Sequence, residues 1–122
     1  MLKESTSYDP NGIIVGNFPV QTAVATIAAG ADLQPGAVLG RVTASGAYVL
    51  SAAAASNGSE TPVAILLSAA DAAGESAEAL ILLTGEVDGG RLSFGAGHTS
   101  QTVETAFRAA GRSLFIRNVT PA

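Results

Sequence analysis

The hydrophobic pattern is strongest between residues 62 and 94, where two short aliphatic runs stand on either side of a small, polar connection. The runs cover residues 63–67 (VAILL) and 79–83 (ALILL), and each is too short and too uniformly apolar for an amphipathic helix. Runs of this kind are typical of strands that are buried on both faces. We therefore predict that these two strands form the centre of the fold and that the rest of the chain covers them.

After the second run, apolar and polar positions alternate until they reach a Gly-Gly pair at residues 89–90. Such a pair is typical of a two-residue hairpin loop. In that register Asp88 would face Arg91, so that opposite charges meet across the strands. Val87 would face Leu92, so that two aliphatic side chains meet. The pattern therefore predicts a tight β-hairpin at this pair.

Shorter patterns predict further strands around this centre. Residues 22–28 alternate in the manner of a strand, and residues 113–117 form a closing strand. Residues 38–43 and 47–50 are typical of a hairpin with a glycine-containing loop. The Ala- and Ser-rich residues 51–61 predict a surface loop.

One segment near the end of the chain has helical periodicity, at about residues 100–111. Apolar side chains recur there every three or four positions, and Glu104 lies four residues before Arg108. Ser100 is a plausible N-cap, and Gly111 supplies the stop. We therefore predict a mainly β fold within the α+β class, with about six to eight strands and one short helix.

The first twenty residues differ from the rest and predict an extended N-terminal arm. A turn signal at residues 9–12 (DPNG) is followed by IIV at 13–15, which is too short to make a core alone. Such a segment either lies on the body as an edge strand or stays loose until a partner offers a sheet edge. We divide the chain into this arm, residues 1–20, and one β-rich domain, residues 21–122.

The composition indicates a subunit that associates with others. Only 13% of the 122 residues are charged and 48% are hydrophobic, so Ala, Ser, Thr and Gly must cover much of the surface. A surface of this kind is poorly suited to a free monomer. The chain length fits a single domain.

The charges and the absence of cysteine exclude several classes of function. The net charge is −4, and the six basic residues are scattered without interleaved aromatics, which argues against direct nucleic-acid binding. Without cysteine there is no disulfide framework and no thiolate metal site. This fits assembly in a reducing cytoplasm. We expect no secretory signal at the N-terminus and no membrane span, because no apolar run approaches about 18–20 residues.

The residues that could carry chemistry form no recognisable catalytic or metal motif. His98, the only histidine, cannot build a multi-histidine metal site, and we expect it to be a solvated loop residue. Glu86 and Asp88 lie two residues apart on one strand face, but Arg91 accounts for Asp88 as an ion-pair partner. The glycines match no phosphate-binding loop. We therefore predict no catalytic residue, no cofactor-binding residue and no metal ligand.

Several distinctive segments follow one another along the chain. They are PGAVLGRVTASGAYV at residues 35–49, GSETPVAILL at 58–67, LILLTGEV at 80–87, LSFGAG at 92–97, and TVE with FRAAG within 102–111. In this order they resemble the head decoration proteins of tailed bacteriophages, the lambda protein D family. The resemblance covers about residues 33–117. It departs from the family at Thr84, where an arginine or similar residue is usual, and in its richness in alanine.

The resemblance implies a β-clip-like small barrel or ribbon that forms a homotrimer. It implies a structural protein on the outer capsid surface of the virion, assembled in the host bacterial cytoplasm. There it would bind the major capsid protein at three-fold positions of the expanded icosahedral head and stabilise it against the pressure of packaged DNA. It implies no enzyme activity and no cofactor; direct nucleic-acid binding and a membrane partner are already excluded by the charge pattern and by the lack of a long apolar run.

The resemblance also implies a role for the arm, because family members order this segment on the shell by strand addition. We therefore expect the apolar and aromatic arm residues to bind the capsid, namely Tyr8, Ile13, Ile14, Val15 and Phe18. Two other functions remain open on the residues alone. One is a trimeric enzyme of the dUTPase type, and the other is a phage fibre or carbohydrate-binding module.

Overall fold

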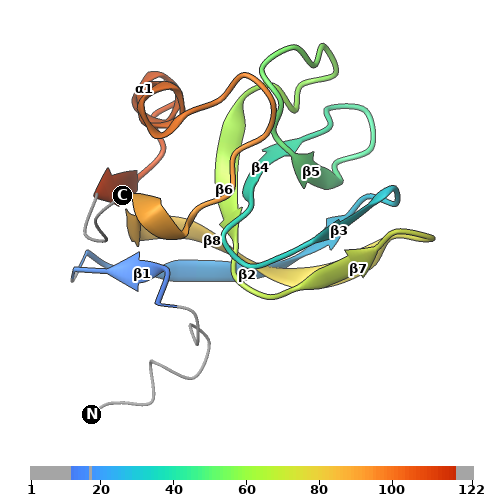
Figure 1. Cartoon of the computed structure of the whole chain (residues 1–122), viewed down its shortest axis with the longest axis horizontal. Coiled ribbons are helices and arrows are strands. Elements are labelled where there is room, and N and C mark those ends of the chain that lie inside the picture. Colours follow the sequence, from blue (N-terminus) through green and yellow to red (C-terminus); the bar gives the residue numbers. More distant parts are fainter. Residues whose placement is uncertain (1–11, 17, 118–122) are drawn as a thin grey trace.

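The computed structural model describes residues 12–16 and 18–117. In this part of the chain it contains nine strands, a short 3-10 helix and one α-helix (Figure 1). They are β1 (Ile14–Val15), β2 (Gln21–Ile27), β3 (Ala31–Leu33), β4 (Val38–Arg41), β5 (Tyr48–Leu50), β6 (Pro62–Leu66), β7 (Ala70–Ala72), β8 (Ala77–Asp88), η2 (Gly89–Arg91), α1 (Ser100–Ala109) and β9 (Leu114–Arg117).

The long strand β8 organises the sheet because it has neighbours along both edges. On one edge it pairs antiparallel with β2 and, further along, with β1. On the other edge it pairs antiparallel with β6 and parallel with β9. The order β8-β2-β5-β4-β6, closed by the pairing of β6 with β8, makes a small five-stranded barrel. The predicted mainly β fold, a β-clip-like small barrel with one helix, is therefore confirmed.

The two aliphatic runs of the sequence form neighbouring central strands, as predicted. In β6 and β8 the register pairs Ile65 with Leu82 and Leu66 with Ile81. Successive side chains of a strand point to opposite faces, so each strand supplies two hydrophobic clusters. Leu66 and Ile81 pack inside the barrel, whereas Ile65 and Leu82 pack beneath α1. This double burial is the reason that both runs are continuously apolar.

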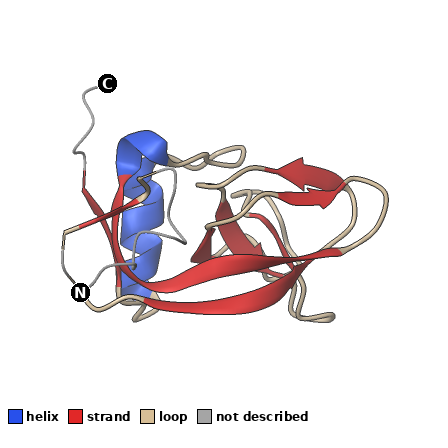
Figure 2. Cartoon of the chain, turned by 90° about the horizontal axis from the view of Figure 1, so that it is seen from below, coloured by secondary structure: helices blue, strands red, loops and turns tan. Residues whose placement is uncertain are grey.

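The helix α1 lies at the end of the molecule that carries β1 and β9, opposite the ribbon formed by β3 and β7 (Figures 1 and 2). Val103 and Phe107, four residues apart, are fully buried and anchor it to the second cluster. The N-cap is Thr99 rather than the predicted Ser100, because Thr99 and Thr102 exchange side-chain and backbone hydrogen bonds in a capping box. Gly111, with φ +71°, follows the helix as predicted.

The predicted hairpin at Gly89-Gly90 is wrong. The chain leaves β8 through the 3-10 helix η2, and Asp88 accepts a hydrogen bond from the Gly90 N–H at 3.0 Å. Val87 already has Ile14 on one side and Ile116 on the other, so this end of β8 offers no edge to a returning strand. The predicted approach of Asp88 to Arg91 does occur, at 3.8 Å.

The other predicted elements are present, and one pair of strands was not predicted. The strand at residues 22–28, the hairpin of β4 with β5, the loop 51–61 and the closing strand are all present. No local pattern predicted β3 and β7, which pair antiparallel with each other in a separate two-stranded ribbon. Each is three residues long, which is too short for an alternation to be recognised.

Candidate functional site

The N-terminal segment joins the body at the end where β1, β9 and α1 meet. Ile13 is 1% exposed and belongs to the hydrophobic cluster under α1, together with Val87 and Phe107. Its carbonyl accepts a hydrogen bond from the Asp88 N–H at 2.8 Å. Ile14 pairs with Val87 in the sheet. Residues 13–15 therefore belong to this chain's own fold.

A second contact holds the segment a few residues further on. Phe18 is 36% exposed, and its ring meets that of Phe115 in β9 edge to face, with 5.0 Å between centroids. The hydroxyl of Thr84 donates a hydrogen bond to the carbonyl of Pro19 at 2.9 Å. The segment is therefore fixed to both β8 and β9 before β2 begins.

The turn between these contacts requires a glycine. Gly16 has φ +69°, and a Cβ at this position would collide with the carboxylate of Glu86. That carboxylate forms an ion pair with Arg117 of β9 at 3.7 Å. Glu86 is therefore accounted for by a structural contact, as Asp88 is by η2 and Arg91.

The structure places the five predicted arm residues in different surroundings. Ile13 is in the core, Ile14 and Val15 form β1, and Phe18 packs on Phe115 at the surface. Tyr8 lies outside the described residues. We call residues 12–16 and 18–20 the arm root, because they lie on the body and follow the residues that precede Gly12 in the chain.

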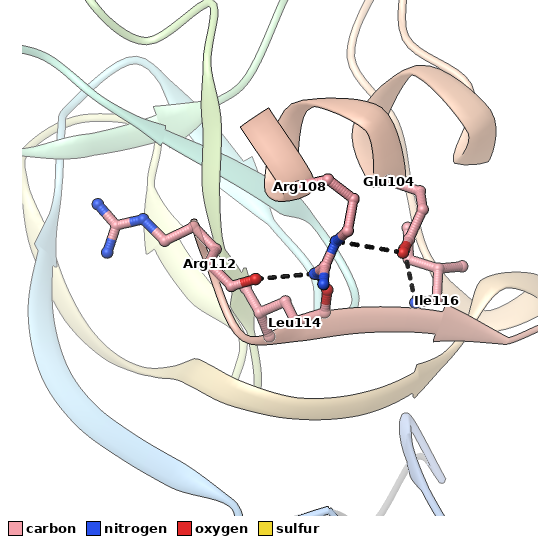
Figure 3. Close-up of polar contacts among 5 residues, drawn as sticks. All are labelled: Glu104, Arg108, Arg112, Leu114 and Ile116. Atoms are coloured by element: carbon pink, nitrogen blue, oxygen red, sulfur yellow. Dashed lines mark hydrogen bonds and ion pairs between the residues drawn. The ribbon is translucent and has the colours of Figure 1, made fainter. Parts of the chain in front are cut away.

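The outer edge of β9, beside the arm root, is covered by two side chains of α1 (Figure 3). Glu104 accepts a hydrogen bond from the Ile116 N–H at 2.9 Å. Arg108 donates to the carbonyl of Arg112 at 2.7 Å and to that of Leu114. The sequence predicted the helical pair Glu104–Arg108, which is formed at 3.6 Å, but not its contacts with β9.

A groove of about 640 Å³ opens on another face of the barrel, between residues 23–26 of β2 and residues 45–48. Within the described residues, β2 and β5 are paired at one position, Ile27 with Tyr48, and separate from there. Val24 lines this groove and is 68% exposed, although it is a large apolar side chain. Its exposure was not recognisable from the sequence, where it is one apolar position of an alternating strand.

His98 is not the solvated loop residue that the sequence led us to expect. Its Nε2 lies 3.2 Å from the hydroxyl of Ser51 and 3.2 Å from the carbonyl of Glu60, and its Nδ1 lies 3.2 Å from the hydroxyl of Thr102. Ser51 is fully buried and donates its own hydroxyl hydrogen to the carbonyl of Ser59 at 2.7 Å. The imidazole therefore ties the loop 51–61 to the start of α1.

The described residues contain no metal-binding cluster and no helix that could cross a membrane. Residues 12–16 and 18–117 contain no cluster of three or more His, Asp or Glu side chains that could hold a metal ion. Their helices are also too short and too polar to cross a bilayer. The Ser51–His98 contact is no nucleophile pair, because the serine is buried and its hydrogen is bonded to a carbonyl.

Comparison with known proteins gives one family. The family model described as bacteriophage lambda head decoration protein D matches residues 10–116. No curated protein sequence matches the chain. The matched region contains the whole barrel, α1, nearly all of β9 and the arm root. The chain therefore belongs to the bacteriophage lambda head decoration protein D family.

Proposed function

We propose that this protein binds as a homotrimer to the outer surface of an expanded phage head, at three-fold positions, and stabilises the shell against packaged DNA. The family match over residues 10–116 carries the proposal, because it covers nearly the whole fold. The partner is the major capsid protein, and the proteins would assemble in the host bacterial cytoplasm. The role is structural and involves no catalysis or cofactor.

We propose that residues 1–20 form the capsid-binding segment, with Tyr8, Ile13, Ile14, Val15 and Phe18 as its apolar members. The geometry of the arm root supports different roles for these residues. Ile13 is buried in the body, so it would act by fixing the direction of the segment. Phe18 and Val15 lie nearer the surface, where they could contact the shell beside a strand contributed by the residues before Gly12.

The arm root would lower the entropic cost of binding. Fixing the backbone of one residue costs about 1–2 kcal/mol, whereas one hydrogen bond returns about 1 kcal/mol. Strand addition by a long, unattached segment is therefore unfavourable unless its side chains are buried. Because residues 13–16 and 18–20 already lie on the body, docking adds no such cost for them.

A trimer would supply the rest of the affinity. Three linked segments act together, and avidity can raise an affinity by ~10² to 10⁴. We propose that the trimer contact includes Val24 and the groove beside it. A large apolar side chain that is 68% exposed beside an opening in the barrel supports this assignment.

Co-sedimentation with heads of the phage that encodes this chain would test the proposal. We expect the purified protein to pellet with expanded, undecorated heads and not with unexpanded ones. Decorated heads should also retain their DNA to a higher temperature than undecorated heads. Equal binding to both forms, or an unchanged temperature of DNA release, would contradict the proposed role.

A further inference from the structure

We infer that α1 closes the outer edge of β9 by means of Glu104 and Arg108, and so prevents a second copy of this chain from adding its own β9 there. The outer edge of β9 adjoins the arm root through Phe115, but the inference does not depend on the proposed capsid and trimer contacts. It holds whether or not those proposals are correct.

The strand β9 has one edge bonded to β8 and one edge that faces α1. The carbonyl of Ser113, at its start, accepts a hydrogen bond from the Gly85 N–H at 3.0 Å, on the side of β8. In a parallel pair the next residue directs its backbone groups to the opposite side. Leu114 and Ile116 therefore present backbone groups along the outer edge.

These outward groups are bonded to side chains and not to another strand (Figure 3). The carboxylate of Glu104 accepts a hydrogen bond from the Ile116 N–H at 2.9 Å. The guanidinium of Arg108 donates hydrogen bonds to the carbonyls of Arg112 and Leu114. The two side chains thus occupy positions where the backbone of an added strand would have to bond.

The arrangement is held in place by contacts with the body. The guanidinium carbon of Arg108 lies 4.2 Å from the centroid of the Phe115 ring, which limits its movement away from the edge. Glu104 and Arg108 approach to 3.6 Å, but an exposed ion pair contributes little energy by itself. What matters is that the buried side chains of Val103 and Phe107 fix α1 beside β9.

An open β9 edge would be an effective template for association. Two of its four residues, Phe115 and Ile116, are of types that favour strands, and both are only partly buried. Exposed edges of this kind pair with other chains unless they are covered or charged. Two copies of β9 can pair antiparallel about a two-fold axis, because each then offers the same outward groups to the other.

A double variant, Glu104→Ala with Arg108→Ala, opens the edge, and Glu75→Ala with Arg112→Ala is its matched control. The control removes the same two charges, but Glu75 is exposed in the connection between β7 and β8 and the side chain of Arg112 points away from the edge (Figure 3). At a protein concentration low enough for the opened variant to keep the parent mass, we expect hydrogen exchange at its Ile116 amide to be roughly tenfold faster or more than in the parent or the control. We also expect its mass by light scattering to exceed that of the parent protein and to rise with concentration.

A third change identifies the surface that associates. Ile116→Pro removes an outward N–H and exchanges a partly buried aliphatic side chain for a smaller one, but it breaks no backbone bond to β8, so it should block strand addition. Added to the opened variant, it should restore the parent mass. If the opened variant keeps the parent mass at all concentrations, or if it still associates with the proline present, the inference is wrong.

Loss of the fold in the double variant would not prevent the test. Glu104→Ala alone frees the Ile116 N–H and leaves Arg108 on Phe115. Faster exchange at Ile116 in dilute protein, together with an increase in mass as the concentration rises, would support the inference. Unchanged exchange or an unchanged mass in this variant would overturn it.

Discussion

Phe18 and Phe115 meet edge to face, with 5.0 Å between their ring centroids and 65° between their planes. This contact joins the N-terminal segment to β9, the last strand of the fold, because Phe115 lies 97 positions after Phe18 in the chain. Together with the burial of Ile13, it fixes the place of the arm root on the body. The proposed capsid-binding segment is therefore anchored at a defined place.

Replacing Phe18 by alanine should loosen the arm root. Aromatic pairs of this kind contribute about 0.5–1.5 kcal/mol beyond the area that they bury, so we expect the free energy of unfolding to fall by about 1 kcal/mol. Chemical denaturation would measure the loss. Phe18→Tyr keeps the ring and should unfold like the parent; equal losses in both variants would contradict the role given to the ring contact.

The burial of Ile13 determines how far the chain can be shortened. A chain that begins at Gly12 retains β1 and every described contact of the arm root, so we expect it to unfold like the full chain. A chain that begins at Val20 loses Ile13 from the core, and removal of a large buried aliphatic side chain typically costs about 2–5 kcal/mol. Thermal unfolding of the two shortened proteins would distinguish them, and equal stabilities would contradict the described packing.

The shorter truncation also tests the capsid-binding segment. If residues before Gly12 bind the shell, the chain that begins at Gly12 should remain folded and bind expanded heads at least about 100-fold more weakly, because the linked contacts are lost. Co-sedimentation over a range of protein concentrations would measure this. Undiminished binding would show that these residues are dispensable.

Val24 provides a test of the trimer contact. A carboxylate placed in an apolar contact must be desolvated, so Val24→Asp should raise the dissociation constant of the trimer by roughly 100-fold or more. Because Val24 is exposed in the single chain, the fold itself should be preserved. Thr105→Asp, on the exposed face of α1, is the control, and analytical ultracentrifugation is the measurement. A trimer that persists in Val24→Asp would exclude this surface.

A close backbone approach explains one glycine of the barrel, Gly40, and gives a further test. A Cβ at Gly40 would collide with the carbonyl of Ser59, whereas nothing lies within 4 Å of a Cβ at Gly74. We expect Gly40→Ala to lower the free energy of unfolding by about 1–3 kcal/mol, as overpacking usually does. Gly74→Ala should have little effect. If the two variants unfold alike, the approach of β4 to the loop 51–61 is described wrongly.

Much of the fold could be predicted from the sequence because its centre is encoded by local patterns. The runs at 63–67 and 79–83 are apolar throughout because β6 and β8 are buried on both faces. The hairpin at Gly89-Gly90 was predicted wrongly because its turn signal is local, whereas the edges of Val87 are filled by Ile14 and Ile116 from distant parts of the chain.

The candidate site was harder to predict for the same reason. The sequence shows Glu104 and Arg108 as a helical pair, but their contacts with β9 depend on the packing of α1 against that strand. His98 appears in the sequence as a loop residue, and its partner Ser51 is 47 positions away. The exposure of Val24 follows from the separation of β2 and β5, which no local pattern encodes.

The central claim, that this protein decorates a phage shell as a trimer, is tested most directly by imaging. Cryo-electron microscopy of expanded heads incubated with the purified full chain should show trimeric density on the outer surface at the three-fold positions, with the arm roots facing the shell. Density for single copies, density at other symmetry positions, or bare heads at saturating protein would contradict the account.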